Sequence, residues 1–451
     1  MQSPSRKFNV LLAFVAAVVT TVVPARAQDW FKTETSTGVD KIRIAAADFK
    51  QGSADSAALK RTFDSVFYAD LSNAGIFDLV SKSLLPQATP GAPSEMNVQQ
   101  WSSAPVSAAM VAFGSATVQS GKLVVNGWLF DTKNVQYPQV LAKQYSEDAT
   151  DDMARQIAHR FADEIIFRLG GGIPGIAETK IVYVHQAGAT KEIWMMDYDG
   201  ANQHQITHLG TVSLSPRISP DGTRIAFSSL GKDGWGIRMY SLVLGRLVNF
   251  PSFGGTNLSP AWASTGNSLA FSSSRTGDPE IWATDANGNG AHRLTSFRGP
   301  DVSPVWNPRT NAQIAWISGR SGLPQVYIMD ADGAGVTRLT DTGYATSPSW
   351  SPNGQFLTFA WNRKYGPGAP GGQDIYVQEV SPGAGGSYRW VQVTHDSGRC
   401  DFPSWSPDGR HIVYASTASG KMEIWSMLAD GTQKRRLTTN GGNDMPNWSW
   451  K

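Results

Sequence analysis

The sequence is poor in cysteine, in net charge and in long apolar runs. Cys400 is the only cysteine among 451 residues, which excludes an internal disulfide framework, so a large core must supply the stability. The formal net charge is only +2, which gives no electrostatic reason to expect nucleic acid as a partner. After residue 23 no segment is apolar enough to cross a bilayer, so we expect no direct membrane insertion.

Motifs of common enzyme chemistry are also missing. The chain has no G-x-S-x-G elbow, no H-E-x-x-H, no paired cysteines and no G-x-x-x-x-G-K-[ST] loop. We therefore expect no catalytic residue, no cofactor and no metal site. His204 and His208 stand four residues apart, but in a strand-to-loop stretch, where that spacing does not align side chains. Asp197 and Asp330 begin D-x-D-G stretches that favour hairpin turns over calcium loops, because the downstream glutamate is absent.

The first residues have the build of a secretory signal peptide. Arg6 and Lys7 precede an apolar run at 8–23, and small residues stand at Ala25 and Ala27. An uncleaved anchor is the alternative, although the run is slightly short for a membrane span. We expect residues 1–27 to be removed by cleavage near Ala27 and the rest of the chain to be exported.

A Pro-x-Trp element recurs in the second half of the chain. Successive copies are separated by 44, 44, 44, 55 and 43 residues. Each copy is followed by an apolar strand, by a strand of the E-I-W type and by a short strand that ends in Leu-Thr. Four strands per unit and six units predict an all-β six-bladed β-propeller. The copies begin at Pro216, Pro260, Pro304, Pro348, Pro403 and Pro446.

The phase of the repeat predicts how the ring closes. The first apolar strand, at Ile181, has no Pro-x-Trp element before it, and the element at Pro446 has no blade after it. We expect the C-terminal strand to complete the first blade. The large side chains expected to fill the wedges between blades are Trp262, Trp306, Trp350 and Trp405.

Residues 41–170 do not repeat and predict an α+β N-terminal domain. A strand is expected at 41–50, a helix within 56–75 and a second helix within 148–170. Three strands between the helices read as a meander, and the helices are expected to cover one face of a mixed sheet.

Two short segments flank this domain. Residues 171–175 are rich in glycine and are expected to link it to the propeller, which we place at 176–451. Residues 28–40 lack periodicity and are interpreted as flexible. They are either a disordered terminus or a segment that becomes ordered on a partner.

The loops that join each fourth strand to the next blade break the repetition. In propellers these loops crowd one rim of the central channel, and here they combine aromatic with polar residues, as a protein-binding surface does. Ordinary variable loops are the alternative. Phe253, Phe297, Tyr344 and Phe402 are expected to be exposed there. The residues assigned to the candidate binding surface are Phe253, Asn257, Arg275, Phe297, Arg298, Asp301, Arg320, Tyr344, Arg363, Arg399 and Asp401.

Three arginines of that set recur at one blade position, just after the second strand. They are Arg275, Arg320 and Arg363. Inter-strand ion pairs with nearby carboxylates are the favoured interpretation, because a repeated position usually serves the repeat. A ring of guanidinium groups on one face of the propeller is the alternative.

An exported chain, an α/β domain and six units of the form P-x-W-S-P-[DN]-G, closed by P-N-W-S-W, resemble the TolB family over essentially the whole mature chain. The resemblance implies a non-enzymatic periplasmic adaptor of the Tol-Pal system, which supports outer-membrane integrity and cell division. A Pal-like peptidoglycan-associated lipoprotein would bind one propeller face. A TolA-like inner-membrane protein would bind the segment after the signal, at Gln28, Asp29, Trp30, Phe31 and Lys32.

The sequence departs from the family pattern in two places. "PRIS" at Pro216 lacks the tryptophan, and "GIRMYSLVLG" at Gly236 lacks the acidic turn. A monomer is expected. The alternative function is a periplasmic hydrolase or lyase that acts at the mouth of the propeller channel.

Overall fold

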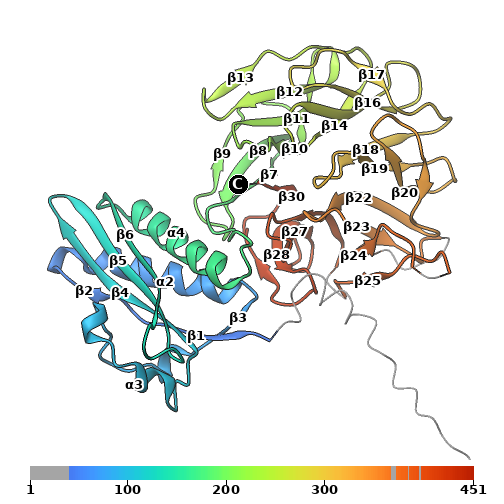
Figure 1. Ribbon diagram of the computed structural model, residues 1–451. Coiled ribbons are helices and arrows are strands. Elements are labelled where there is room, and N and C mark those ends of the chain that lie inside the picture. Colours follow the sequence, from blue (N-terminus) through green and yellow to red (C-terminus); the bar gives the residue numbers. More distant parts are fainter. Residues whose placement is uncertain (1–39, 367–371, 384, 396–397, 451) are drawn as a thin grey trace, which may run out of the picture.

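The protein consists of an N-terminal α/β part and a ring of six four-stranded sheets (Figure 1). The computed structural model describes residues 40–366, 372–383, 385–395 and 398–450. The predicted fold class is therefore confirmed. Within these residues, no helix combines the length and the apolar character needed to cross a membrane.

The N-terminal sheet is mixed, with the strand order β3-β1-β4-β5-β6 and β2 paired with β4. β1 runs parallel to β3 and β4, whereas β4, β5 and β6 form the predicted antiparallel meander. The strands are β1 Ile42–Ala46, β2 Lys50–Gln51, β3 Phe77–Leu79, β4 Met110–Gln119, β5 Lys122–Asp131 and β6 Gln139–Asp148. The helices are α2 Ala57–Asn73, α3 Val98–Ser102 and α4 Asp151–Leu169, with 3-10 turns at Ala54–Ser56, Lys82–Leu84 and Pro93–Glu95.

The first strand is shorter than predicted, because Phe49 turns into the core. Its backbone N–H is donated to Asp64 Oδ1 at 3.0 Å instead of to a neighbouring strand. Its ring packs against Phe63 and Phe161, whose ring centroids lie 4.6 and 5.9 Å away. The strand predicted at 41–50 therefore ends at Ala46.

The helices α2 and α4 cover one face of the sheet, as predicted. Thr150 caps α4 by accepting the backbone N–H of Met153, and two aspartates occupy its first turn, where the helix dipole favours negative charge. The opposite face is covered by residues 80–108, which include α3 and the fully buried Trp101. The sequence pattern predicted no element in that stretch.

Blades 2 to 6 each pair their four strands in chain order, from the inner strand outward. Blade 2 is β10 Ser213–Ile218, β11 Arg224–Gly231, β12 Gly234–Ser241 and β13 Arg246–Val248; blade 3 is β14 Asn257–Trp262, β15 Ser268–Ser273, β16 Glu280–Asp285 and β17 His292–Arg293. Blade 4 is β18 Asp301–Trp306, β19 Gln313–Ser318, β20 Gln325–Asp330 and β21 Thr337–Arg338; blade 5 is β22 Tyr344–Trp350, β23 Phe356–Asn362, β24 Asp374–Glu379 and β25 Trp390–Gln392. Blade 6 is β26 Cys400–Trp405, β27 His411–Ser416, β28 Glu423–Leu428 and β29 Arg435–Arg436.

Blade 1 contains both ends of the propeller chain, as predicted. Its inner strand is β30 Asn443–Trp448, followed outward by β7 Lys180–Ala187, β8 Thr190–Asp197 and β9 His204–Gln205. β30 is antiparallel to β7, with Asn443 opposite His185 and Trp448 opposite Ile181. The indole N–H of Trp448 is also donated to Thr179 Oγ1 at 2.7 Å, so the closure is bonded at both ends of the strand.

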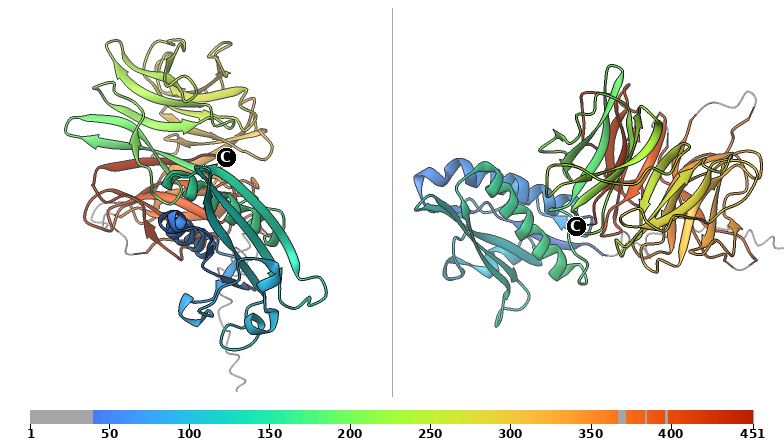
Figure 2. Two further views of the ribbon diagram at one scale, coloured as in Figure 1. Left: turned by 90° about the vertical axis from the view of Figure 1, so that its left-hand side faces the viewer. Right: turned by 90° about the horizontal axis from the view of Figure 1, so that it is seen from above.

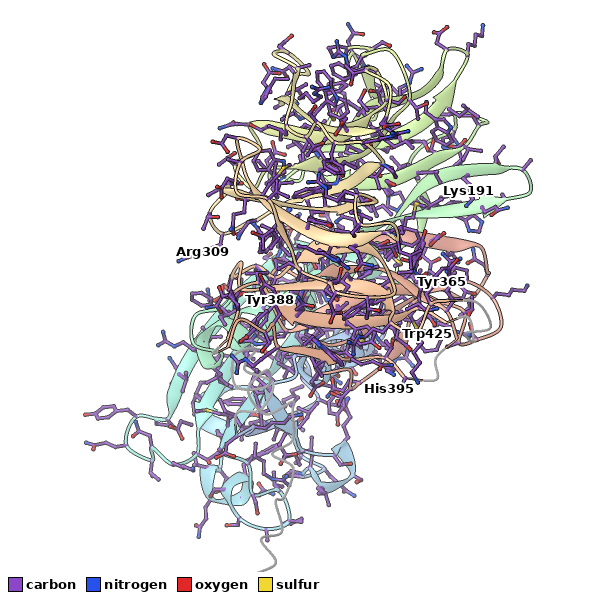
Figure 3. The ribbon with its side chains drawn as sticks, turned by 90° about the vertical axis from the view of Figure 1, so that its right-hand side faces the viewer. Lys191, Arg309, Tyr365, Tyr388, His395 and Trp425 are labelled. Carbon is purple, nitrogen blue, oxygen red and sulfur yellow. The ribbon has the colours of Figure 1, made fainter. Side chains whose placement is uncertain are left out.

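The propeller has two different faces. We call the side where each fourth strand passes to the next inner strand the loop face; the hairpins between second and third strands open on it too. We call the opposite side, where the inner strand turns into the second strand, the turn face. Figure 3 views the ring from its edge, with Arg309 of a turn-face connection on one side and Lys191 and Tyr365 on the other.

The N-terminal part packs against the turn face at blades 1 and 6 (Figure 2). Asp70 of α2 accepts hydrogen bonds from His159 of α4 and from the hydroxyl of Tyr198, which follows β8. On blade 6, the imidazole of His411 contacts the Asn73 carbonyl at 2.7 Å through Nε2. Buried polar contacts therefore fix the two parts against each other.

Candidate partner-binding face

All of the residues assigned to the candidate surface that the structure describes lie at the loop face. Inner strands start there and second strands end there, as the pairing of Asn257 with Ser273 and of Asp301 with Ser318 shows. The assigned residues come from blades 3 to 6 and from the loops between them. Their exposure differs widely, and this separates supporting residues from those that can contact a partner.

The most exposed aromatic side chain of the assigned set is Phe297, in the loop from blade 3 to blade 4. It is 49% exposed. Its backbone N–H is donated to Glu280 Oε1 at 2.9 Å, which fixes the loop. The guanidinium carbon of Arg320 lies 4.8 Å from its ring centroid, within the range of a cation–π contact. The neighbouring Arg298 is exposed.

Asp301 lies beneath this aromatic residue as a buried anion. It is fully buried and accepts a hydrogen bond from Arg320 Nη2 at 2.8 Å. Arg320 in turn donates from Nε to Ser318 Oγ and contacts the ring of Tyr327 at 5.1 Å. Because a buried charge is stable only when it is paired, Asp301 fixes the orientation of Arg320 under Phe297.

The other two repeated arginines mainly contact aromatic rings. Arg275 forms no ion pair with a described residue, and its guanidinium carbon lies 4.5 Å from the Trp282 ring. Arg363 lies 4.1 Å from the Trp390 ring, and its ion pair with the exposed Asp341 is long, at 3.9 Å. The predicted ion pair therefore holds for Arg320 and is wrong for Arg275. The partners of these two arginines are therefore mainly the aromatic rings of Trp282 and Trp390 instead of carboxylates.

Asp401 ties blade 6 to blade 5. It is buried and accepts hydrogen bonds from Ser347 Oγ at 2.9 Å and from Thr346 Oγ1 at 3.3 Å. The exposed Arg399 covers it with a 3.0 Å ion pair. Asp444 of β30 lies at the matching position of blade 1, and burial raises the pKa of its carboxyl. Both carboxylates therefore belong to the loop-face ends of inner strands.

Several residues expected to be exposed are not. Phe253 stacks on Phe271 with ring centroids 4.8 Å apart, so it is half-buried against the core between blades 2 and 3. Phe402 packs against a core cluster, and Tyr344 lies against Tyr365 with ring centroids 5.2 Å apart. Asn257 is buried, and its amide donates to the carbonyls of Gly254 and Gly255. Of the four aromatic residues expected at the surface, only Phe297 is exposed.

A buried carboxylate clamp, which the sequence analysis missed, supports the loops. The glutamate that opens the third strand accepts the hydroxyl proton of a threonine that follows the fourth strand. It also accepts a backbone N–H from the loop beyond. The signal was available, because E-I-W and L-T recur with a separation of 15 residues. The pairs are Glu192–Thr207 with Gly210, Glu280–Thr295 with Phe297, and Glu423–Thr438 with Gly441.

The remaining motifs are structural. Asp197 and Asp330 each begin a tight hairpin turn in which the backbone N–H of Gly200 or Gly333 bonds back to the aspartate carbonyl, so the hairpin interpretation is confirmed. His204 and His208 are both exposed. No cluster of three metal-ligating side chains occurs in the part of the chain that the structure describes. Gln28, Asp29, Trp30, Phe31 and Lys32 lie outside the described residues, as does the predicted cleavage site.

Comparisons with known proteins match both parts of the chain. Residues 168–451 match the family model described as "TolB beta propeller domain", and residues 35–137 match the "TolB amino-terminal domain". A "Protein TolB homolog" of Chlorobium chlorochromatii is 31% identical over 274 residues, which cover 60% of this chain and 60% of the relative. A "Tol-Pal system protein TolB" of Anaeromyxobacter dehalogenans is 33% identical over 272 residues, which cover 58% and 59%.

These alignments span less than two thirds of the length of the curated relatives. A solved structure covers more of the chain. The crystal structure of TolB from Acinetobacter baumannii matches with a TM-score of 0.75 and 24% sequence identity, over 91% of this chain and 97% of that one. At this identity the match shows a shared fold.

Proposed function

The chain belongs to the TolB family, and on that premise we propose that it is a non-enzymatic adaptor of a Tol-Pal system in the periplasm. In this proposal it binds a Pal-like lipoprotein through the loop face and a TolA-like protein through residues 28–40. The role supports outer-membrane integrity and cell division. The predicted signal peptide at residues 1–27 is the basis for the location.

The observation that carries the docking proposal is the Phe297 site. Binding hot spots are enriched in aromatic residues and arginine, held in place before the partner arrives. Phe297 is exposed, while its backbone is fixed by Glu280 and its ring by Arg320. Arg298 next to it in the chain is an exposed cation, and Arg275 and Arg399 expose two more on the same face. An acidic and aromatic surface on the lipoprotein would complement this patch.

The geometry of the ring also favours the loop face. The turn face is partly covered by α2 and α4, which contact blades 1 and 6. The loop face is free of contacts with the N-terminal part in the described residues, so a globular partner can reach it without separating the two parts. In this proposal residues 28–40 serve the second partner.

A two-partner capture experiment tests the proposal. The chain without residues 1–27 is immobilised and exposed to the purified Pal-like and TolA-like domains of the same organism. We expect both to bind, and we expect deletion of residues 28–40 to abolish capture of the TolA-like domain alone. Capture of neither partner by the intact chain would contradict the adaptor role. TolA capture that survives the deletion would contradict the segment assignment only.

A further inference from the structure

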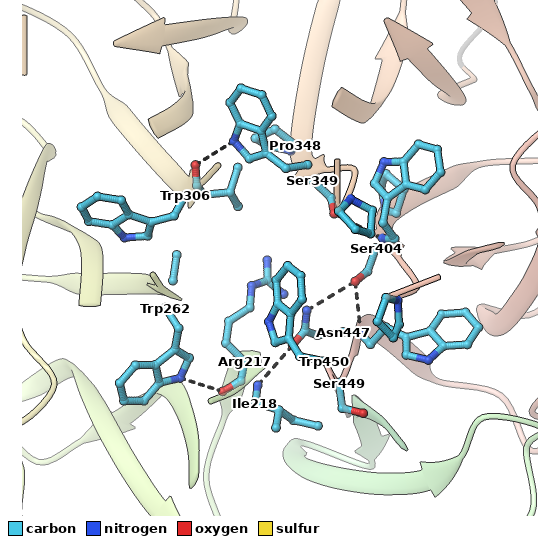
Figure 4. Close-up of a pocket in the computed structure, with 18 residues that line it drawn as sticks. Arg217, Ile218, Trp262, Trp306, Pro348, Ser349, Ser404, Asn447, Ser449 and Trp450 are labelled. Carbon is cyan, nitrogen blue, oxygen red and sulfur yellow. Dashed lines mark hydrogen bonds between the residues drawn. The ribbon is translucent and has the colours of Figure 1, made fainter. Parts of the chain in front are cut away.

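The central channel contains a small cavity where the inner strands end at the turn face (Figure 4). Its volume is about 70 Å³, enough for a group of a few heavy atoms. The Pro-x-Trp elements of the inner strands line it, together with Pro352 and Pro407 of two turns. It therefore lies at the opposite end of the channel from Asp401 and Asp444, which stand near the start of their inner strands.

The wall of this cavity is polar on one side only. The variable position of the Pro-x-Trp element points one side chain per blade toward the channel. In blades 3 and 4 that residue is Ala261 or Val305, and in the other four blades it carries a polar group. The polar residues are Ser349, Ser404, Asn447 and Arg217.

The hydrogen bonds of the three neutral side chains leave their protons free. Ser349 Oγ accepts the backbone N–H of Trp405 at 3.3 Å, and Ser404 Oγ accepts that of Trp448 at 3.1 Å. Asn447 Oδ1 accepts the N–H of Ile218 at 3.2 Å, while one of its amide protons goes to Ser404 Oγ at 3.3 Å. Each acceptor is thus engaged by the neighbouring blade. The two hydroxyl protons and the second amide proton are left to face the channel.

Arg217 places a cation among these donors. Its side chain extends from blade 2 into the channel, as Figure 4 shows. The guanidinium donates only to the carbonyl of Pro216, at 3.2 Å, and it forms no ion pair with a carboxylate of the described residues. Burial lowers the pKa of Arg217 to about 10, so the group still carries its charge at neutral pH. A guanidinium that is partly removed from water without an anion is costly, and a ligand that supplies the negative charge lowers that cost.

We propose that this cavity is a binding site for a small oxyanion, held by Arg217 and by the protons of Ser349, Ser404 and Asn447. The fork of a guanidinium matches the two oxygens of a carboxylate, and phosphate offers the same chemistry with a tetrahedral shape. The apolar wall at Ala261 and Val305 fits the carbon end of a carboxylate. The site is independent of the proposed adaptor role, because it lies at the other end of the channel from the loop face.

Titration of the intact protein with small anions tests the site. Sodium acetate and sodium phosphate are added at constant ionic strength, with chloride as the balancing salt, and the tryptophan fluorescence is recorded, since several tryptophans line the cavity. We expect saturable binding of at least one of the two anions. Tighter binding of acetate identifies a carboxylate site, and tighter binding of phosphate identifies a phosphate site.

Two substitutions at one position and one matched control complete the experiment. Arg217→Gln should weaken binding at least tenfold, and Arg217→Lys, which keeps the charge without the fork, should weaken it less. Arg246→Gln removes the same charge from an exposed edge strand of the same blade and should leave binding unchanged. If the wild type binds neither anion, or if Arg217→Gln and Arg246→Gln change binding equally, the proposal is wrong.

Discussion

The two faces of the propeller are built from the same repeat but use it differently. On the turn face the connections of blades 2, 5 and 6 follow one pattern, in which a serine bonds both the side chain two residues later and a backbone N–H of its own turn; the serines are Ser219, Ser351 and Ser406. On the loop face the connections differ from blade to blade and are held by buried carboxylates such as Asp301 and Asp401. Residues that repeat therefore build the ring, and residues that break the repeat give one face its individual surface.

The faces also differ in what covers them. The N-terminal part occupies a sector of the turn face through Asp70, His159 and Tyr198. The loop face carries exposed groups such as Phe297 and Arg298 without a covering element among the described residues. We infer that the turn face serves assembly of the chain and that the loop face serves recognition.

The strand β30 is the inner strand of blade 1 and closes the ring, so its removal should have the largest effect on stability. We expect a chain that ends at Gly442 to lose its cooperative thermal transition, because blade 1 loses its inner strand and every pairing between β30 and β7. Circular dichroism during heating measures this. A synthetic peptide of residues 440–451 should restore part of the transition. A truncated chain that melts like the intact one would contradict the closure.

Blade 4 has an arginine on each face, and the stability cost of removing each one compares the two faces. Arg320→Ala leaves the buried Asp301 without its cation and should lower the free energy of unfolding by about 3 kcal/mol. Arg309→Ala, at the exposed turn of the same blade, should change it by less than about 0.5 kcal/mol. Denaturant titration measures both. Equal losses would show that the loop face is not held by buried charge.

A smaller effect is expected at the junction of the two parts, as a dependence on pH. Burial raises the pKa of Asp163 to about 7, where the carboxyl accepts the backbone N–H groups of Ala177 and Glu178. The folded state then holds a proton that the unfolded state has released, so stability falls as pH rises from about 4 to about 7. Between pH 5.5 and 8 the loss should be roughly 2 kcal/mol.

The variant Asp163→Asn isolates this contribution. The free energy of unfolding of this variant should lack this component of the pH dependence. The wild-type value minus the variant value should therefore fall by roughly 2 kcal/mol between pH 5.5 and 8. Other groups at the junction also titrate, since the pKa of His159 is raised by the hydrogen bond and the charge of Asp70, which outweigh its burial. An unchanged difference across the pH range would rule out Asp163 as a titrating group.

The repeat made the ring predictable, because spacing alone determines blade number and closure. It did not reveal which loop residues are buried. Each inner strand contains a bulge at the residue before its proline, which adopts a left-handed backbone, with φ of 54° at Ser259 and 51° at Phe402. That bulge lies beside residues that the linear pattern placed at the surface, and the packing there buries Asn257, Asp301 and Asp401.

Other features depend on contacts between distant segments. Phe253 is half-buried because it stacks on Phe271 of β15. Arg217 is surrounded by residues of five other blades, so its position in the channel follows only from the closed ring. The cover formed by residues 80–108 has little periodicity, and its core residue Trp101 is identified only by the sheet face that it contacts. Local pattern predicted the elements, and tertiary packing determined the site.

Calorimetric titration of the chain with the purified Pal-like domain tests most directly whether recognition belongs to the loop face. The double variant Phe297→Ala/Arg298→Ala removes exposed groups from the loop face of blade 4, and Arg309→Ala removes one from its turn face. We predict that the double variant weakens binding at least tenfold, about 1.4 kcal/mol, and that Arg309→Ala leaves the affinity within twofold. Binding that is indifferent to the double variant, or that is lost with Arg309→Ala, would contradict the account.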